Sequence, residues 1–367
     1  MTLFNRKSTY DAAQMTRDFD VYLQKVQKKL KHREAMQVLI SSPKRGVEYQ
    51  YPAQSGDKPF HIASVGKVFT AVLIELLAER GWFTIDDRLV KYLPSADLAG
   101  LFVFEGKDYA DEVTIRQLLG HTSGVADYFE DPVVVGAPFL QRIIDQPETR
   151  WTPDLLLDFT RTQQRTIASP GRTFHYSDTG YILLGKLIEC ISDKAFHEHL
   201  HDEFFVPLEM GDSYLAFYSE PAKQPRKPIQ PLYVNGTDIS TYESLSADWS
   251  GGGIVSTTSD LLKFQRGLRN GRLIRAETLR SMEVFDHKFR TGIHYGLGMM
   301  QIHFGEFFFL LKRWPKLTGH IGITATHMFY DATSDTHIIM NFGSTANMVT
   351  SFRVLIDLLG KLNKIKG

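Results

Sequence analysis

Residues 61–71, H-I-A-S-V-G-K-V-F-T-A, constrain this chain more than any other stretch, because they set a serine and a lysine three positions apart where a helix begins. Apolar residues recur after them at helical spacing as far as Leu77, and Gly81 predicts the helix end. Ser64 and Lys67 would therefore share one face of the first turn. A serine hydroxyl becomes nucleophilic when a neighbouring base takes its proton, and first-turn N–H groups can receive the negative charge that develops. The stretch predicts a lysine-activated serine nucleophile.

The spacing Ser-x-x-Lys occurs three times in the chain, so the spacing alone does not identify a site. The pairs that begin at Ser41 and Ser55 enclose a proline and a Gly-Asp dipeptide respectively, and both of these are typical of turns. Neither pair is expected to hold two side chains on one helix face. Only the pair at Ser64 is followed by an apolar helical stripe, although an ordinary capped core helix remains the alternative there.

The composition is that of an ordinary globular protein. Of 367 residues, 43% are hydrophobic, which is enough to bury a large core in one big domain or two lobes. The 42 basic and 42 acidic residues cancel without a long block of one sign, which argues against a nucleic acid or an anionic membrane surface as partner. Cys190 is the single cysteine, so an intrachain disulfide and a cysteine metal cluster are excluded. Its apolar neighbours predict a buried helix position.

The N-terminal residues, M-T-L-F-N-R-K-S-T-Y, lack the apolar segment of a secretion signal. No apolar run approaches the roughly 18 residues that a membrane-spanning helix needs. As the chain is written, we expect a cytoplasmic protein without a membrane span. If an export signal was removed, the protein would work outside the cytoplasm.

Strand-like segments lie near both ends of the chain. Two predicted hairpins comprise residues 35–40 with 47–51 and residues 323–330 with 337–342. Helical periodicity precedes the first hairpin, where Ser8 or Thr9 would cap a helix, and follows the second hairpin over residues 349–362.

The segment between these hairpins has mostly helical signals. Thr114 with Gln117 predicts a capping box, and Thr152-Pro153 predicts another helix start. The chain is therefore expected to be an α/β (α+β) protein, with an antiparallel sheet flanked by N- and C-terminal helices and an inserted, mostly helical lobe. Residues 1–82 and 251–367 would form the sheet lobe and residues 83–250 the helical lobe. The active site would lie between the lobes.

Two further motifs contain residue types that could complete a site. Tyr176-Ser177-Asp178 lies in F-H-Y-S-D-T-G-Y, and His320-Ile321-Gly322 lies just before a predicted strand. A phenol beside an amine can pass protons between nucleophile and leaving group, and a polar side chain on an edge strand, such as that of His320, can hold a substrate carboxylate. Gly322 would let the substrate approach the strand backbone. The next N–H, on Ile323, could join that of Ser64 as an oxyanion hole.

Together these motifs resemble the serine β-lactamase and penicillin-binding protein superfamily, on the class C-like branch that also holds D-alanyl-D-alanine carboxypeptidases and esterases. The resemblance runs from about Val38 to Leu358. It rests on the order of the segments I-A-S-V-G-K-V-F-T-A, L-L-G-H-T-S-G-V, Y-S-D-T-G-Y-I-L-L-G, P-L-E-M-G-D-S, S-G-G-G-I-V-S-T and G-H-I-G.

The resemblance implies a role for each motif. Ser64 would be the acylated nucleophile, Lys67 its proton partner and Tyr176 the general base and acid, with the amides of Ser64 and Ile323 as the oxyanion hole. Neither a metal nor an organic cofactor is implied. The expected partner is a small-molecule or short peptide or ester substrate, and β-lactams are candidate covalent ligands.

The chain departs from this family at two positions. Asp178 stands where the family usually has asparagine, and its charge could hold Lys67 protonated and disfavour an anionic substrate. His320 stands where the third motif often has lysine, as in many esterases and peptidases of this branch, and Gly322 follows it as expected. The resemblance thus implies a serine hydrolase of the D-alanyl-D-alanine carboxypeptidase or esterase type. A penicillin-binding sensor that is acylated without turnover remains the alternative.

A third alternative comes from the segment H-E-H-L-H. His197, Glu198 and His201 satisfy H-E-x-x-H and would be two zinc ligands and a general base of a metallopeptidase. The surrounding charges and apolar residues are also those of a solvated amphipathic helix, which is the interpretation that we favour. His121, in H-T-S-G, is expected to have a structural role in a turn, where it would bond buried backbone groups.

Overall fold

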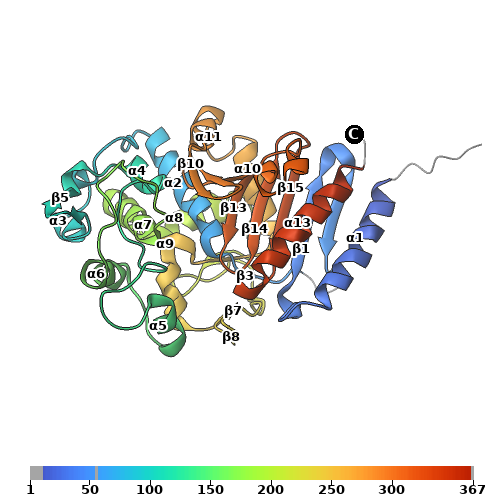
Figure 1. Cartoon of the computed structure of the whole chain (residues 1–367), viewed down its shortest axis with the longest axis horizontal. Coiled ribbons are helices and arrows are strands. Elements are labelled where there is room, and N and C mark those ends of the chain that lie inside the picture. Colours follow the sequence, from blue (N-terminus) through green and yellow to red (C-terminus); the bar gives the residue numbers. More distant parts are fainter. Residues whose placement is uncertain (1–10, 54–56, 365–367) are drawn as a thin grey trace, which may run out of the picture.

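The N- and C-terminal parts of the chain meet in one antiparallel sheet in the computed structural model, which describes residues 11–53 and 57–364. Eight strands lie in the order β10-β11-β12-β13-β14-β15-β1-β2 (Figure 1). Their bounds are β1 Gln37–Ser42, β2 Val47–Tyr51, β10 His287–Arg290, β11 Ile293–Tyr295, β12 Met300–Ile302, β13 Leu317–Gly322, β14 Thr326–Asp331 and β15 Thr336–Asn341. Pairing of β1 with β15 joins segments about 300 residues apart, with Gln37 opposite Asn341.

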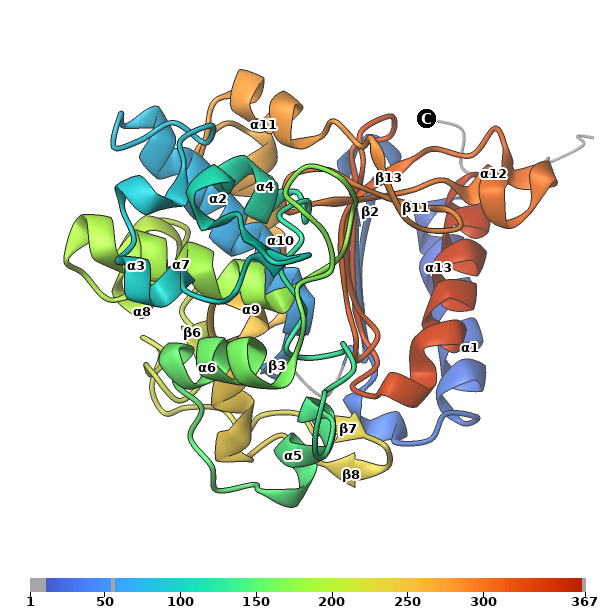
Figure 2. The same cartoon turned by 60° about the vertical axis from the view of Figure 1, so that its left-hand side comes forward.

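Two helices cover one face of the sheet, as Figure 2 shows. They are α1 (Ala12–Gln27) and α13 (Met348–Leu362). Each buries an apolar stripe at helical spacing in a core shared with that face, which includes Phe19 of α1 and Leu358 of α13. The side chain of Asp11 caps α1, whereas the expected caps Ser8 and Thr9 lie outside the described residues.

The other face carries a second, larger core that joins α2 (Gly66–Glu79) and α10 (Thr258–Arg269) to the inserted helices. Helix α2 packs against α7 (Asp178–Ser192) and α9 (Trp249–Gly252), and nearly all of its residues are buried. A helix that is apolar on every side is typical of the middle of a large core. The helix after Ser64 is therefore surrounded by other elements.

Short helices and hairpins make up the rest of the middle of the chain. The helices are α3 Ser95–Leu98, α4 Ile115–Leu119, α5 Phe139–Asp145, α6 Pro153–Gln163, α8 Phe196–Leu200, α11 Ala276–Met282 and α12 Phe304–Phe307. The strands are β3 Phe60–His61, β6 Tyr214–Leu215 and β9 Ile254–Ser256 in one small sheet, β4 Val103–Phe104 with β5 Lys107–Asp108, and β7 Tyr233–Val234 with β8 Thr237–Asp238. The predicted capping box at Thr114 and the predicted cap at Thr152 are confirmed.

The predicted fold class is confirmed, and so are both terminal hairpins, but three details of the prediction were wrong. Strands β10, β11 and β12 were not predicted, because they are three or four residues long and so give too short a stretch of alternation. His320 lies within β13, which is an interior strand between β12 and β14, so it is not on an edge strand. Cys190 is exposed rather than buried. Among the described residues, no helix has the length and apolar character needed to cross a bilayer.

Candidate active site

The turn that carries Ser64 is held closely between β13 and α9. Ala63 to Val65 form a single 3₁₀ turn that leads into α2, and Ala63 has a left-handed φ of 47°. A side chain at Gly252 would place its Cβ 2.8 Å from the Ala63 carbonyl carbon, and one at Gly322 would place it 2.8 Å from the Ile62 oxygen. We expected Gly322 to admit substrate. The structure shows that the absence of its side chain also lets β13 approach the Ser64 turn.

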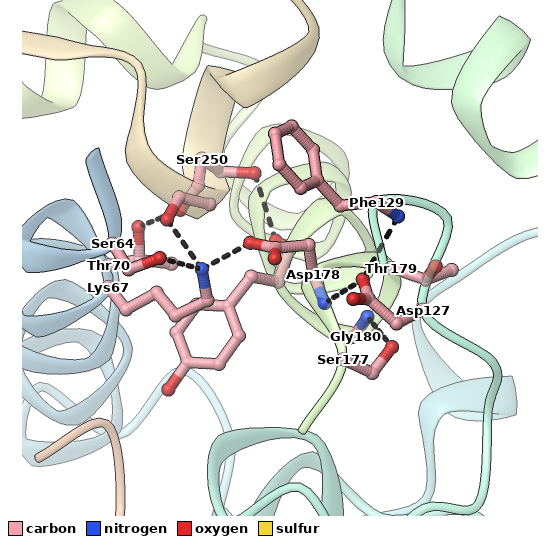
Figure 3. Close-up of polar contacts among 12 residues, drawn as sticks. Ser64, Lys67, Thr70, Asp127, Phe129, Ser177, Asp178, Thr179, Gly180 and Ser250 are labelled. Atoms are coloured by element: carbon pink, nitrogen blue, oxygen red, sulfur yellow. Dashed lines mark hydrogen bonds and ion pairs between the residues drawn. The ribbon is translucent and has the colours of Figure 1, made fainter. Parts of the chain in front are cut away.

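Lys67 is fully buried beneath this turn, and its ammonium group has three oxygen partners (Figure 3). Its Nζ donates to Ser64 Oγ at 3.2 Å and to the Gly251 carbonyl at 2.8 Å, and it forms an ion pair with Asp178. The side chain of Asp178 is only 14% exposed. A buried cation needs such a counter-charge, because an unpaired charge in the interior is strongly destabilising.

The N-terminus of α7 presents Asp178 to Lys67. Ser177 caps the helix with its side chain, and the carboxylate of Asp127 accepts the backbone N–H of Asp178 at 2.9 Å. Burial and the neighbouring charge of Asp178 raise the pKa of Asp127 well above its ordinary value. The position of Asp178 thus follows from a local helix cap and a contact with a loop 51 residues earlier.

Tyr176 lies beside the same ammonium group, with its ring centroid 5.1 Å from Lys67 Nζ. Burial and the charge of Asp178 raise the pKa of the Tyr176 phenol well above 10, while a hydrogen bond with Ser64 acts in the opposite direction. The phenol is therefore neutral in the resting site and carries a proton that it can donate.

Three buried, hydrogen-bonded rings, those of His121, Tyr295 and His320, lie on one side of Tyr176 and are called the buried wall below. The ring of His121 lies 4.2 Å from that of Tyr176, and its Nδ1 accepts the N–H of Ser177 at 3.0 Å. Its Nε2 lies 3.0 Å from the hydroxyl of Tyr295, which lies 3.2 Å from His320 Nε2. His121 therefore bonds a buried backbone group, as the sequence predicted for a structural turn.

His320 is part of this wall and is not a lining residue of the cavity at Ser64. Its side chain is completely buried, and burial together with the charge of Lys67 lowers its pKa to about 3. The imidazole is therefore uncharged at neutral pH. The structure does not bring His320 to a position where it could hold a substrate carboxylate directly, because its side chain packs toward Tyr295.

A cavity of about 300 Å³ opens above Ser64. Its polar lining includes Tyr176 and Asp178, which the sequence singled out. It also includes Asp248, Glu130 and Arg290, and these three had no local sequence signal. Burial and the charge of Asp178 raise the pKa of Asp248 to about 7. Most of the remaining wall is apolar: Phe129, Phe289, Ile293, Met300, Phe307, Ile321, Ile323, Met348 and Phe352. Ser64, Gly322 and Ile323 all border this space.

The H-E-x-x-H segment does not form a comparable site. Glu198 accepts the backbone N–H of Ala195 at 3.0 Å and so caps its own helix, and His201 bonds the adjacent Asp202. Phe196 and Leu200 are buried on the other side of this helix, as the amphipathic interpretation predicts. No third ligand group joins these histidines among residues 11–53 and 57–364.

One other group in the described chain has the donor types of a metal site. The ligand atoms of His294, His303 and Glu306 lie within 4.8 Å of one another. The two imidazole rings are stacked at 4.2 Å with an interplanar angle of 23°, so their in-plane lone pairs do not converge on one point. His294 instead bonds Glu306 at 2.6 Å, and we interpret the group as a hydrogen-bonded cluster.

Comparisons with known proteins identify a family for the chain. A family model described as Beta-lactamase matches residues 23–351. Penicillin-binding protein 4 from Amycolatopsis lactamdurans is 28% identical over 218 residues, which are 58% of this chain and 51% of that protein. The chain therefore spans about half the length of this curated relative.

Two solved structures share the fold. The D-amino acid amidase from Ochrobactrum anthropi SV3, complexed with D-phenylalanine, has a TM-score of 0.74 at 20% identity and covers 95% of this chain and 100% of its own. A D-stereospecific amidohydrolase from Streptomyces sp. has a TM-score of 0.71 at 23% identity and covers 91% of this chain and 95% of its own.

Proposed function

Because the chain belongs to the β-lactamase family of serine hydrolases, we propose that it hydrolyses a small amide or ester through an acyl-enzyme on Ser64. The observation that carries the proposal is the set of contacts around one hydroxyl. Lys67 hydrogen-bonds Ser64, Tyr176 lies beside the same ammonium group, and Asp178 at the start of α7 pairs with Lys67. A nucleophile with a base and a proton donor within reach is what acyl transfer needs.

In the proposed reaction, Ser64 Oγ attacks the substrate carbonyl carbon while its proton passes to Lys67 in its amine form. Tyr176 gives its phenol proton to the leaving group and recovers one from Lys67, so both groups return to their starting states. The backbone N–H groups of Ser64 and Ile323 would bind the oxyanion. Water then attacks the acyl carbonyl, and its proton returns to Ser64 by the same route.

The cavity supports an apolar acyl group as the preferred substrate part. Aromatic and aliphatic side chains, including Phe289 and Met300, form most of its wall. Three acidic residues, Glu130, Asp178 and Asp248, line the cavity against one basic residue, Arg290, and His320 is uncharged and turned away. This excess of negative charge favours an amidase or esterase over a carboxypeptidase, because a carboxypeptidase must bind a substrate carboxylate. The fold neighbour complexed with D-phenylalanine is consistent with an aromatic amino-acid amide.

Asp178 also motivates a second candidate function, a sensor that is acylated by β-lactams without turnover. Its carboxylate stands where the family usually has asparagine and pairs with Lys67, whose proton transfers are needed for deacylation as well as for acylation. In that case an acyl-enzyme would accumulate and steady hydrolysis would be absent.

The decisive experiment compares the wild-type protein with Ser64→Ala. Amide and ester panels should be hydrolysed by the wild type only, and a fluorescent penicillin or a serine-reactive phosphonate should label the wild type only. Ser41→Ala is the matched control, because its serine also belongs to a Ser-x-x-Lys sequence but bonds Glu48 on the sheet. Turnover retained by the Ser64 variant would refute the proposal. Labelling without turnover would support the sensor.

A further inference from the structure

A run of exposed apolar residues extends from α12 into the loop that follows it. Phe307, Phe308, Phe309 and Leu310 are exposed to 41%, 51%, 72% and 64% respectively. Four consecutive large apolar residues in water are unusual in a folded chain, because each would gain by burial. We call residues 307–316 the apolar loop. Figure 2 shows α12 projecting on the side of the sheet that carries α1 and α13.

The apolar loop is a built structure with a fixed base. The carboxylate of Glu306 lies 2.6 Å from His294 Nε2 and accepts a hydrogen bond from the backbone N–H of Gly292 at 3.1 Å. The ring of Phe304 packs edge-to-face on Trp314 at 5.5 Å, which closes the two ends of the loop on each other. The exposed side chains are therefore held away from the core by buried and bonded neighbours.

Backbone groups at the tip of the loop find partners inside it. The N–H groups of Phe308 and Leu311 donate to the carbonyls of Phe304 and Phe308 at 3.1 and 2.9 Å. Lys312 donates to the Phe309 carbonyl at 3.1 Å. These bonds lower the cost in desolvation of the N–H groups of Phe308, Leu311 and Lys312 when the tip enters an apolar medium.

The charged residues of the apolar loop are all basic. They are Lys312, Arg313 and Lys316, and all three are exposed. Glu306, just before the loop, is engaged by His294 and Lys288. Apolar residues flanked by basic ones match the boundary of a bilayer, where hydrocarbon lies under negatively charged headgroups.

We propose that the apolar loop docks the protein on a lipid surface with anionic headgroups, inserting Phe308, Phe309 and Leu310 while Lys312, Arg313 and Lys316 contact the headgroups. The tip is too short to span the bilayer, so attachment is peripheral. Phe307 belongs both to the loop and to the cavity wall, and its ring packs on Phe352 at 6.0 Å. Docking would therefore place the mouth of the cavity near the lipid surface.

The test measures sedimentation of the full chain with phosphatidylcholine vesicles that contain or lack phosphatidylserine. We expect binding that is stronger with phosphatidylserine. Phe309→Asp with Leu310→Asp should reduce the bound fraction by about 10-fold or more, because it places two charges in the inserted tip. Lys312→Gln with Arg313→Gln and Lys316→Gln should weaken binding to the anionic vesicles by about fivefold for each charge removed.

The matched control is Val134→Asp with Val135→Asp, which changes two adjacent apolar residues that are also exposed, to 54% and 71%. This control should bind vesicles like the wild type. Equal binding by the wild type and the Phe309 variant would overturn the proposal, and so would a wild-type dimer in solution that this variant dissociates. Thermal melting of each variant shows whether it is folded. The proposal does not depend on turnover at Ser64, since vesicle binding is measured without substrate.

Discussion

The Ser64 turn and the His197 helix present similar local arrangements, yet the fold uses them in opposite ways. Each places two chemically apt side chains about one helical turn apart. Around Ser64 and Lys67, groups from distant parts of the chain converge, including Asp178 from 111 residues away. Around His197, the bonded groups are sequence neighbours, since Glu198 caps its own helix.

The difference shows what separates a motif from a site. Lys67 is fully buried and must have partners, so α7 supplies the carboxylate of Asp178 and α9 supplies the carbonyl of Gly251. His201 is 50% exposed and bonds the adjacent Asp202, so nothing requires a distant group to approach it. Burial of the charged member of a motif is therefore a better guide to chemistry than residue spacing.

Loss of the Tyr176 hydroxyl should have the largest effect after loss of Ser64 itself. Tyr176→Phe keeps the ring that packs on His121 but removes the proton that the leaving group needs. We expect kcat/KM to fall by about 100-fold or more, with little change in KM or melting temperature. Steady-state kinetics with an amide substrate measure this. A loss smaller than about threefold would remove Tyr176 from the reaction.

Neutralising Asp178 tests whether the buried ammonium group of Lys67 depends on its ion pair. Asp178→Asn keeps an oxygen for Lys67 but removes the negative charge. The variant should lose about 3 kcal/mol of stability, since the buried ammonium loses its counter-charge. Denaturant unfolding of the two proteins measures the loss. A variant as stable as the wild type would show that Lys67 does not need the charge of Asp178.

Asp248 makes a smaller, pH-dependent contribution. Its pKa is raised to about 7, so the carboxyl is neutral below that pH and adds a negative charge to the cavity above it. As the pH rises from 6 to 8, KM for a substrate with a quaternary ammonium group should fall by about threefold relative to KM for an uncharged analogue. Asp248→Asn should abolish this pH dependence. Stability also depends on this carboxyl. The Asp248 carboxyl ionises at lower pH in the unfolded chain than in the folded chain, so the wild type loses stability relative to Asp248→Asn as the pH rises toward 7.

Changes to the His197 helix should have the smallest effect. His197→Ala with His201→Ala removes both candidate zinc ligands from a helix that holds neither Ser64 nor any cavity residue. Activity should stay within about twofold of the wild type, with or without a chelator. A loss of about 10-fold or more in a variant with normal melting would show that these histidines take part in the chemistry.

Local patterns predicted the terminal hairpins, the caps at Thr114 and Thr152 and the helix after Ser64, because each depends on residues within a few positions of one another. The roles assigned to Tyr176 and Ile323 came from family resemblance and remain proposals. The apolar loop also had a local signal, since Lys312, Arg313 and Lys316 come soon after its run of apolar residues. The equal numbers of acidic and basic residues in the whole chain do not show this local excess of positive charge.

Local sequence thus determined that Ser64 and Lys67 could act together and that a helix follows them. The tertiary structure decided which of them meet. It pairs Asp178 with Lys67, turns His320 into the buried wall, adds Asp248 to the cavity and leaves the tip of the apolar loop in solvent. The physical reason is that helix caps and turns are set by short-range sterics and hydrogen bonds. Burial and the contacts between distant charges exist only after the two cores have packed around the sheet.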